Sequence, residues 1–445
     1  MNNQPESGLW VLRRWNSFTP RIPSIYTGPG GGYFLRWNNK GIAIDPGFDY
    51  LDNLQKAGIA LKDIHAIITT HSHPDHVADF EPLLMMLVKR HERMQAHGLG
   101  EQKRLDLFLS MDTAEKYRQL ITQQSPLIVN DTRSPELDSL GTKELPDYQI
   151  KIQTLPADHV QNGSEIQANP IRKALSIILH MYSDRDLSDN NRCLSIGFTG
   201  DTKYNELLAG EMKKCEIVIA HLGSVDFAKL MGLAAMQDTT ETQQMKRDLL
   251  ETNFKQEEEQ AFIDILGLRE QSGTSVIKEL DDILTGKPTG SGFQSGHLLF
   301  EGTLRLFAGL FKDGRARTKL GVVSEFGLEL GSFRHKVAEA INIAVFGSPE
   351  GLSERRVISG DKDLAIRLSG GKQKCAHSTI GQCNKHGECL KDKAQFLLRC
   401  TLCHQWVCLP CIREHSIKHY DQSIFYNCDL DWGPSYYPRP PVIRL

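Results

Sequence analysis

Three histidines and an aspartate, His71, His73, Asp75 and His76, lie within six residues of one another. The apolar, β-branched run at residues 66–68 directly before them predicts a buried strand. The end of such a strand is where a sheet presents side chains to a ligand. Imidazole and carboxylate groups are common zinc ligands, and packing alone does not require four of them together. The segment therefore predicts a metal site at a sheet edge.

The spacing within this motif suggests two metal ions. His71 and His73 are two residues apart in an extended segment, so their side chains point the same way and can share one ion. Asp75 and His76 fall at a turn or in the first helical residues, from which they can reach a second ion. The alternative is a solvated loop in which Asp75 caps a helix beginning near Val77. Metal binding is favoured because a cap needs no histidines.

Further ligand-type side chains follow other predicted strands. His159 follows the alternating run 148–155, Asp201 follows the apolar run 194–199, and His221 follows the apolar run 217–220. The core pattern returns at residues 296–303, which contain His297. A lone strand-end histidine is more often structural, and a Gly-Asp-Thr aspartate is more often part of a turn. In company with residues 71–76, these side chains are better explained as ligands at the same edge.

Elements before and after the motif alternate between strands and helices. Residues 30–47 predict two strands joined by an Asn/Gly turn, residues 52–57 a helix, and residues 64–69 the strand that carries the motif. A helix is expected from Val77, followed by a strand at residues 105–110. This order indicates an α/β fold.

Composition excludes several classes of protein. At 445 residues the chain is long enough for a large domain and a small appendage, and its formal net charge of −3 provides no general attraction for nucleic acid. No apolar run approaches the roughly 18 residues of a membrane span, and the polar N-terminal residues do not resemble a signal peptide. A cytoplasmic location without membrane association is therefore expected.

Two segments interrupt the pattern of the main domain, which is predicted to span residues 1–346. Residues 224–295 predict amphipathic helices with the acidic run 257–259, first as a solvated helical insertion and second as a partner-binding arm. A small basic cluster is interpreted as a solvated turn or, alternatively, as a phosphate contact. It contains Lys312, Arg315, Arg317 and Lys319.

Cysteines dominate the C-terminal region. A linker is predicted at residues 347–374 and a zinc-binding domain at residues 375–445, because eight of the ten cysteines lie between Cys375 and Cys428. Eight ligands in four close pairs predict two tetrahedral zinc sites, since so small and polar a segment could scarcely fold without metal. The expected ligands are Cys383, His386, Cys400, Cys403, Cys408, Cys411, His415 and His419. Cys375, Cys389 and Cys428 could replace one of these.

With these residues identified, residues 28–345 resemble the metallo-β-lactamase-fold hydrolases. The resemblance implies a four-layered αββα sandwich with two zinc ions at one edge. It assigns one ion to His71, His73 and His159, the other to Asp75, His76 and His297, and a bridging position to Asp201.

Within that superfamily the chain most resembles ribonuclease Z. Residues 200–202 match its Gly-Asp-Thr motif, His221 takes the place of its proton-donating histidine, and residues 296–297 resemble its last ligand motif. His221 is followed by Leu222 and Gly223 instead of Glu-Ala-Thr. The interval between His159 and Asp201 is also short for the family's tRNA-gripping arm, so tRNA 3′ processing is not inferred. A homodimer is compatible with the resemblance.

The C-terminal pairs resemble a B-box-type zinc finger. Its cross-braced pairing would place Cys383, His386, Cys408 and Cys411 on one zinc, and Cys400, Cys403, His415 and His419 on the other. The long interval between His386 and Cys400 departs from the B-box spacing. Fingers of this kind mostly bind protein partners, and nucleic-acid contact is the second interpretation.

The ligand set predicts a metal-dependent hydrolase. Two divalent ions roughly 3.5–4 Å apart activate a bridging water and stabilise charge on an attacked phosphoryl or carbonyl group. A phosphodiesterase or nuclease acting on RNA or DNA is the leading prediction, with Asp75 and His221 as catalytic residues and His221 as general acid. A thioester, lactone or amide hydrolase is the rival, and an interaction scaffold with weak activity is the third. Two catalytic and about two structural Zn²⁺ ions are expected, and Mn²⁺ is compatible with the catalytic ligands.

Overall fold

The computed structural model describes thirteen segments of the chain: residues 7–14, 30–98, 105–124, 136–137, 140–159, 174–223, 297–326, 334–348, 351–352, 355–362, 364–368, 396–400 and 405–412. Contacts divide the chain into one unit formed by Met1–Ser224 with Gly296–Leu445 and a second unit, Val225–Ser295. The second unit lies outside the described residues, as does the helical insertion predicted at residues 224–295.

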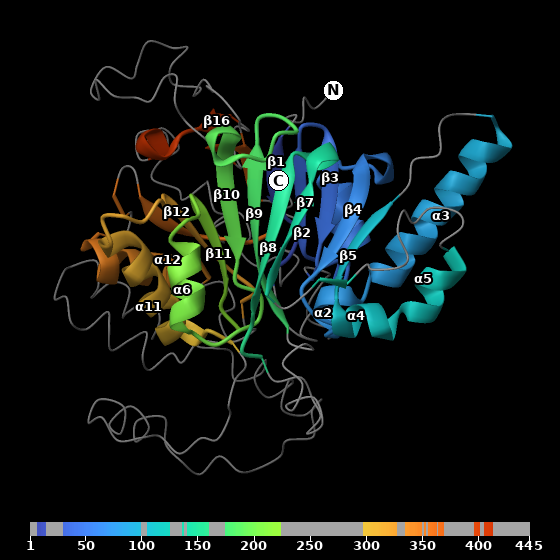
Figure 1. The fold of residues 1–445 in the computed structure, drawn as a ribbon. Helices are drawn as coiled ribbons and strands as arrows, with labels where there is room; N and C mark the ends of the chain where they lie inside the picture. The colour runs from blue at the N-terminus through green and yellow to red at the C-terminus, as the bar shows by residue number, and fades with distance from the viewer. Residues whose placement is uncertain are drawn as a thin grey trace, which may run out of the picture. The chain divides into compact units, whose positions relative to one another are not determined.

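Two β-sheets form the centre of the first unit (Figure 1). Among the described residues, the first sheet has nine strands in the order β16 (Trp406–Val407), β15 (Phe396–Arg399), β14 (Ala365–Leu368), β1 (Gly8–Val11), β2 (Tyr33–Trp37), β3 (Lys40–Ile44), β4 (Ile64–Thr69), β5 (Asp106–Ser110) and β6 (Glu136–Leu137). The second has seven strands in the order β13 (Arg356–Ser359), β12 (Leu320–Ser324), β11 (Ile217–His221), β10 (Arg192–Phe198), β9 (Leu175–Tyr182), β8 (Ile150–Pro156) and β7 (Gly141–Leu145).

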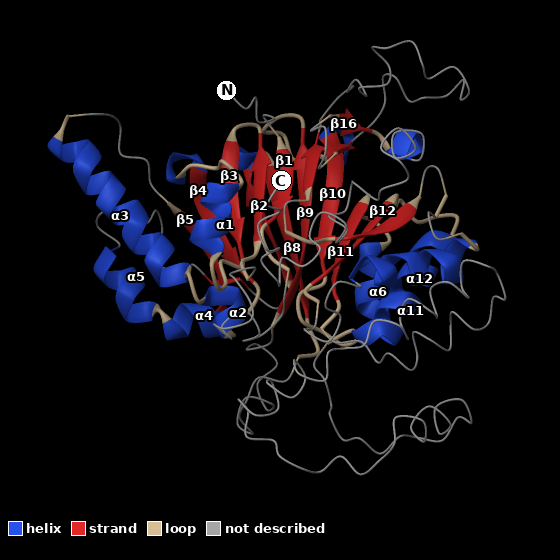
Figure 2. Cartoon of the chain, turned by 180° about the vertical axis from the view of Figure 1, so that it is seen from behind, coloured by secondary structure: helices blue, strands red, loops and turns tan. Residues whose placement is uncertain are grey.

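Helices cover the outer face of each sheet, as both ribbon views show (Figures 1 and 2). The helices on the first sheet are α1 (Tyr50–Lys56), α3 (Phe80–Ala96), α4 (Met111–Lys116) and α5 (Arg118–Gln124). The helices on the second sheet are α6 (Glu206–Met212), α11 (Leu299–Lys312) and α12 (Arg334–Phe346). The layers are therefore helix, sheet, sheet, helix, which confirms the predicted α/β sandwich of the metallo-β-lactamase type.

Alternation along the strands explains the two cores. Ile177, Leu179 and Met181 of β9 face the other sheet and are completely buried in the apolar core between the two sheets. On the outer face of the first sheet, Ile67 of β4 and Leu109 of β5 belong to a second core with the helices. Helices thus cover the outer face of the first sheet, and its parallel strands β3, β4 and β5 are apolar on both sides, as parallel strands usually are.

Two glycines allow helices of the second sheet to pack closely. A Cβ atom at Gly197 of β10 would lie 2.2 Å from Sδ of Met212 in α6, and one at Gly321 of β12 would lie 2.5 Å from Cε1 of Phe307 in α11. An added methyl group at either position would overpack the interface, at a cost of about 1–3 kcal/mol.

Parallel strand pairing brings several strand ends to one edge. In the second sheet β10, β11 and β12 run parallel to one another, and in the first sheet β3, β4 and β5 do the same. The carboxyl ends of parallel neighbours lie at the same edge of a sheet, which is where ligands bind in open α/β sheets.

Most of the predicted elements are confirmed where they fall on described residues. The hairpin at residues 30–47 is β2–β3, and its turn residues Asn38 and Asn39 have φ values of 45° and 62°. Asparagine tolerates this left-handed conformation, which suits a two-residue hairpin turn. The predicted strands at residues 64–69 and 217–221 match β4 and β11.

The C-terminal region differs from the prediction. Residues 347–374, predicted to be a linker, contain β13 of the second sheet and β14 of the first. Their apolar runs are only two or three residues long and lie near charged residues, so they carry little strand signal. The hairpin β15–β16, predicted to belong to a separate domain, continues the first sheet beyond β14.

No helix within the described segments is both long enough and apolar enough to cross a membrane.

Candidate metal site

The segment after β4 turns sharply into the short helix α2 (Pro74–Val77). Pro74 occupies the first helical turn, where its missing N–H costs nothing, and His73 precedes it in an extended conformation. His71 and His76 are completely buried, and Asp75 is buried as well. The motif is thus held by a strand on one side and a helix start on the other.

Four donor groups form a first ligand group, which we define as His71, His73, His159 and Asp201. Their donor atoms all lie within 4.8 Å of one another. His159 follows β8, with Nε2 3.0 Å from Nδ1 of His73, and Asp201 follows β10, with Oδ2 3.5 Å from Nε2 of His71. The structure therefore brings together the three residues that the resemblance assigned to the first ion and Asp201, which it assigned to the bridging position.

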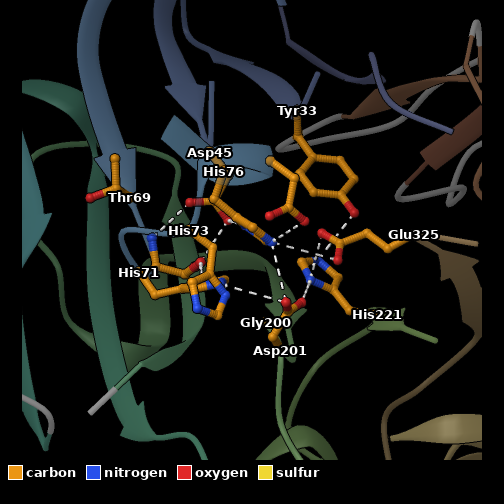
Figure 3. A network of polar contacts seen from close by, with 12 residues as sticks. Tyr33, Asp45, Thr69, His71, His73, His76, Gly200, Asp201, His221 and Glu325 are labelled. Carbon is orange, nitrogen blue, oxygen red and sulfur yellow. Dashed lines mark hydrogen bonds and ion pairs between the residues drawn. The ribbon is translucent and has the colours of Figure 1, made fainter. Parts of the chain in front are cut away.

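A second ligand group consists of His76, Asp201, His221 and Glu325, whose donor atoms also lie within 4.8 Å of one another. Nε2 of His76 lies 3.4 Å from Oδ2 of Asp201 and 3.7 Å from Oε2 of Glu325. Asp75 is adjacent, with Oδ2 3.4 Å from the same nitrogen. Figure 3 shows His76, His221 and Glu325 pointing toward Asp201, which belongs to both groups.

The distances suit metal ions. Two ligands of a tetrahedral zinc ion, each about 2.0–2.1 Å from it, lie about 3.4 Å apart. Nε2 of His71 and Nε2 of His76 are buried without a hydrogen-bond partner among the described residues, although both face Oδ2 of Asp201. Buried nitrogens rarely stay unsatisfied. A divalent ion between them and the carboxylate would satisfy both.

The directions of the pKa shifts favour the metal-binding forms of the side chains in the first ligand group. Burial lowers the pKa of His71 well below its ordinary value, and it lowers the pKa of His73 with the help of the neighbouring His159. Burial alone would raise the pKa of Asp201, but the histidines around it, His297 and His76 foremost, lower it overall. Neutral imidazole and ionised carboxylate are the forms that bind metal.

Asp45 supports the ligand segment through contacts with Thr70 and His76. It follows β3, has a φ of 47°, and is completely buried. Its carboxylate accepts hydrogen bonds of 2.7 Å from both the backbone N–H and the hydroxyl of Thr70, and it lies 3.0 Å from Nδ1 of His76. A carboxylate on the second ring nitrogen fixes the orientation and tautomer of a ligand histidine.

Glu325 was not expected from the sequence. It follows β12 directly, whereas Asp201 follows β10 after two further residues, so the only signal was a charged residue after a buried apolar strand. Its carboxylate is completely buried, and Oε1 lies 2.5 Å from Nη1 of Arg13 and 2.7 Å from Nδ1 of His221. Burial is the main cause that raises its pKa, and Arg13 and His221 oppose that rise.

Two consecutive arginines after β1 were also missed. Arg13 contacts Glu325 and lies 3.6 Å from Oδ2 of Asp75, whereas Nε of Arg14 donates a 2.6 Å hydrogen bond to Asp361 after β13. Both arginines are buried. The N-terminal strand therefore supplies two positive charges to the carboxylates at this edge.

The buried position of His221 does not fit its predicted role as general acid. It is completely buried, and its ring nitrogens face Glu325 and Asp201 on one side and, 3.1 Å away, the hydroxyl of Tyr33 on the other. A ring enclosed in this way has no open side from which to reach a substrate.

His297, in contrast, is partly exposed to solvent. Its side chain is 24% exposed, and Nδ1 lies 3.7 Å from Oδ2 of Asp201. A Cβ atom at Gly223 would lie 2.5 Å from Cβ of His297, so glycine is needed at that position. The ring packs beside His159, with 5.3 Å between the centroids. His297 was predicted to bind the second ion, but it lies outside the second ligand group, in which Glu325 is found.

The basic cluster is not brought to this edge. Arg317 lies 3.9 Å from Glu216, which precedes β11, and Lys319 precedes β12, whereas His221 and Glu325 lie at the other ends of these two strands. The strand length of five residues separates the two ends by roughly 16 Å. The predicted phosphate contact of Lys312, Arg315, Arg317 and Lys319 does not serve the two ligand groups.

Only part of the predicted zinc finger can be located. Cys400 follows β15, and Cys408 and Cys411 follow β16; all three are buried. The other predicted ligands, Cys383, His386, Cys403, His415 and His419, lie outside the described residues. The zinc finger and its pairing stay a prediction.

Comparisons with known proteins agree with the fold. A family model described as the beta-lactamase superfamily domain matches residues 40–250. Ribonuclease Z of Streptomyces avermitilis is 25% identical over 203 residues, which cover 42% of this chain and 66% of that protein. Ribonuclease Z of Thermobifida fusca is 47% identical over 45 residues, which cover 10% of this chain and 14% of that protein.

The chain thus spans less than two thirds of the length of these relatives. Among solved structures, the metallo-beta-lactamase fold protein YhfI from Bacillus subtilis aligns over 81% of this chain and 99% of its own, at 13% identity and a TM-score of 0.46. The chain has the metallo-β-lactamase fold and is similar in sequence to ribonuclease Z enzymes, which supports a metal-dependent hydrolase.

Proposed function

We propose that this protein is a metal-dependent phosphodiesterase, with RNA as its substrate class. The observation that carries the proposal is the pair of adjacent ligand groups that share Asp201 at one sheet edge. Sequence similarity to ribonuclease Z supports a phosphodiester over other substrates of the same chemistry.

The first ligand group would hold one divalent ion, and the second, with Asp75 beside it, would hold another. Asp201 would bridge them. When bound, the two ions supply an activated water as nucleophile and offset the charge that develops on the attacked phosphoryl group. The buried nitrogens of His71 and His76 support this arrangement because nothing else among the described residues satisfies them.

His297 would protonate the leaving group. As the bond between phosphorus and the leaving oxygen breaks, that oxygen becomes an alkoxide and takes a proton from a nearby acid. His297 is favoured over His221 because a quarter of its side chain is open to solvent, whereas His221 is completely buried. His221 would then help to hold the second ion and keep Glu325 in place.

The C-terminal cysteines would form a structural zinc region that contacts a protein partner. Cys400, Cys408 and Cys411 follow neighbouring strands of the first sheet, which supports a role next to the hydrolase core. Mass spectrometry of full-length protein before and after mild thiol-reactive treatment would count the zinc ions that depend on these cysteines, and about two are expected. A zinc count unchanged by the treatment would contradict the region's role in metal binding.

The test of the main proposal is a substrate panel. Full-length protein loaded with Zn²⁺ or Mn²⁺ is assayed on bis(p-nitrophenyl) phosphate, single-stranded RNA, single-stranded DNA and a thioester, in parallel with His73→Ala. Hydrolysis of the phosphodiesters, lost in the variant, is expected because His73 belongs to the first ligand group. Turnover of the thioester without any phosphodiester would overturn the proposal in favour of a small-molecule hydrolase.

A further inference from the structure

We infer that the two ligand groups select different ions: the first takes Zn²⁺, and the second takes a harder, oxygen-preferring cation such as Mn²⁺. The inference rests on the proposed function, since it assumes that both groups bind metal. It concerns this chain's own residues, Glu325 and Arg13 above all.

The donor atoms of the two groups differ. The first group offers three imidazole nitrogens and one carboxylate oxygen, from His71, His73, His159 and Asp201. The second group offers two imidazoles and two carboxylates, from His76, His221, Asp201 and Glu325, and the Asp75 carboxylate lies 3.4 Å from His76. Imidazole suits zinc, whereas carboxylate oxygens suit Mn²⁺ and Mg²⁺, which accept more than four ligands.

Glu325 is fixed in this position by its backbone. Its φ is 57°, a left-handed conformation that is unfavourable for a residue with a side chain. Hydrogen bonds hold the segment on both sides: Gly223 N–H donates to the Glu325 carbonyl at 3.0 Å, and Phe326 N–H donates to the Arg14 carbonyl at 3.0 Å. Strained residues that the surrounding structure holds in this way cluster at functional sites.

Arg13 fixes the carboxylate itself. Nη1 of Arg13 lies 2.5 Å from Oε1 of Glu325, and both side chains are completely buried. Oε2 faces His76 at 3.7 Å. The ion pair between Oε1 and Arg13 favours the orientation in which Oε2 faces His76, and the arginine also offsets part of the charge of the Glu325 and Asp75 carboxylates.

The fixed order of affinities for divalent metals places Zn²⁺ above Mn²⁺ at any one site. Selectivity therefore appears as a difference in the ion that each ligand group retains when both ions are present. With Mn²⁺ in large excess over limiting Zn²⁺, the nitrogen-rich first group should retain Zn²⁺, and the oxygen-rich second group should fill with Mn²⁺.

The test uses full-length protein stripped of labile metal and incubated with one added equivalent of Zn²⁺ and excess Mn²⁺. Bound Mn²⁺ is counted by electron paramagnetic resonance and by mass spectrometry after desalting. The C-terminal cysteines do not enter this count, since thiolates are soft ligands that disfavour Mn²⁺. The variants are Glu325→His, Glu325→Gln and His73→Ala, and Glu216→Gln, a buried glutamate at the far end of β11, is the matched control.

We expect about one Mn²⁺ per chain in the unmodified protein and in Glu216→Gln. The same count is expected in His73→Ala when Zn²⁺ is omitted, because Zn²⁺ that the damaged first group no longer retains would otherwise compete for the second. Glu325→His and Glu325→Gln should retain Mn²⁺ at least about tenfold more weakly, and Glu325→His should take Zn²⁺ in its place. Absence of Mn²⁺ from the unmodified protein, or its loss in His73→Ala but not in the Glu325 variants, would overturn the inference. Circular dichroism confirms that each variant is folded before metal is counted.

The two proposals fail in different ways. If both groups bind Zn²⁺ and phosphodiesters are cleaved, only the assignment of ions is wrong. If Mn²⁺ enters the second group as expected and no phosphodiester is cleaved, the proposed function is wrong and the inference about the ions stands.

Discussion

His180 and the pair His71 and His76 are buried histidines that differ in what their ring nitrogens face. His180 of β9 lies on the outer face of the second sheet, with Nδ1 2.8 Å from the Ser195 hydroxyl and Nε2 3.1 Å from the Gln153 side chain. At the metal edge, Nε2 of His71 and Nε2 of His76 have no hydrogen-bond partner within the described segments. Burial of a histidine is therefore a poor sign of function, whereas an unsatisfied nitrogen aimed at a carboxylate is a good one.

The largest effect is expected from Asp201→Ala. This carboxylate belongs to both ligand groups, so its loss would remove a ligand from each proposed ion, and with it several kcal/mol of charge stabilisation. Phosphodiester hydrolysis should fall by at least about a thousandfold. Steady-state assays with a chelator-treated sample as the baseline measure this. Activity that survives both the substitution and the chelator would show that the reaction occurs elsewhere.

A smaller effect, which depends on the leaving group, is expected from His297→Gln. Loss of a general acid should slow RNA cleavage about a hundredfold, because the departing alkoxide needs a proton. Bis(p-nitrophenyl) phosphate should be affected far less, since nitrophenolate leaves without help. Comparison of kcat for the two substrates measures the difference. An equal loss on both would point to metal binding by His297 and return it to its predicted place as a ligand.

Asp45→Asn tests whether the Asp45 carboxylate orients His76 for metal binding. The amide keeps the shape of the carboxylate but can no longer accept hydrogen bonds on both sides from Thr70 and His76. Metal affinity should weaken about 10–100-fold, as is usual when the outer partner of a ligand histidine is lost. Competition with a chromophoric chelator measures the affinity. Unchanged affinity would mean that β4 and α2 alone orient His76.

The smallest effect on activity is expected from His180→Gln, which should change the rate at pH 7 less than about twofold while altering the pH dependence of stability. Burial, followed by Arg192 and Lys151, lowers the pKa of His180 from 6.5 to about 4. Between these values the unfolded chain binds the extra proton, so stability is present above about pH 6.5 and is lost as the pH falls toward 4. The loss is up to about 3 kcal/mol.

Urea unfolding at a series of pH values compares this variant with the unmodified protein. The free energy of unfolding should fall less steeply for His180→Gln between pH 6.5 and 4. If the free energy of unfolding has the same pH dependence in both proteins, the protonation of His180 does not contribute to stability between pH 6.5 and 4.

The sequence predicted those parts of the site that follow long, apolar strands. His71 and Asp201 follow such runs, and His221 ends one. β4 belongs to the first sheet, β10 and β11 pair in parallel in the second, and the donor atoms at their ends lie together. Glu325 was not predicted as a site residue. A single glutamate after β12 cannot be distinguished from a surface residue until the strand is known to lie beside β11. Arg13 was not predicted because its position depends on the pairing of β1 with β14, which are far apart in the sequence.

The role of His297 could not be derived from spacing either. It precedes helix α11 and does not end a strand, so strand geometry carries no information about its reach. The short strands β13 and β14 were missed for a related reason, since a run of four residues acquires its strand character from its neighbours in the sheet.

Pairing of β1 with both β2 and β14 also has a consequence for folding during synthesis. Gly8 is opposite Arg367, so β1 emerges from the ribosome long before the strand that completes its hydrogen bonds. Until then β1 is an open edge, available to another nascent chain. Contacts of such long range also slow folding. Arg13, which follows β1, would therefore form its ion pair with Glu325 late in folding. The second ligand group would then be completed only in the last stage of folding.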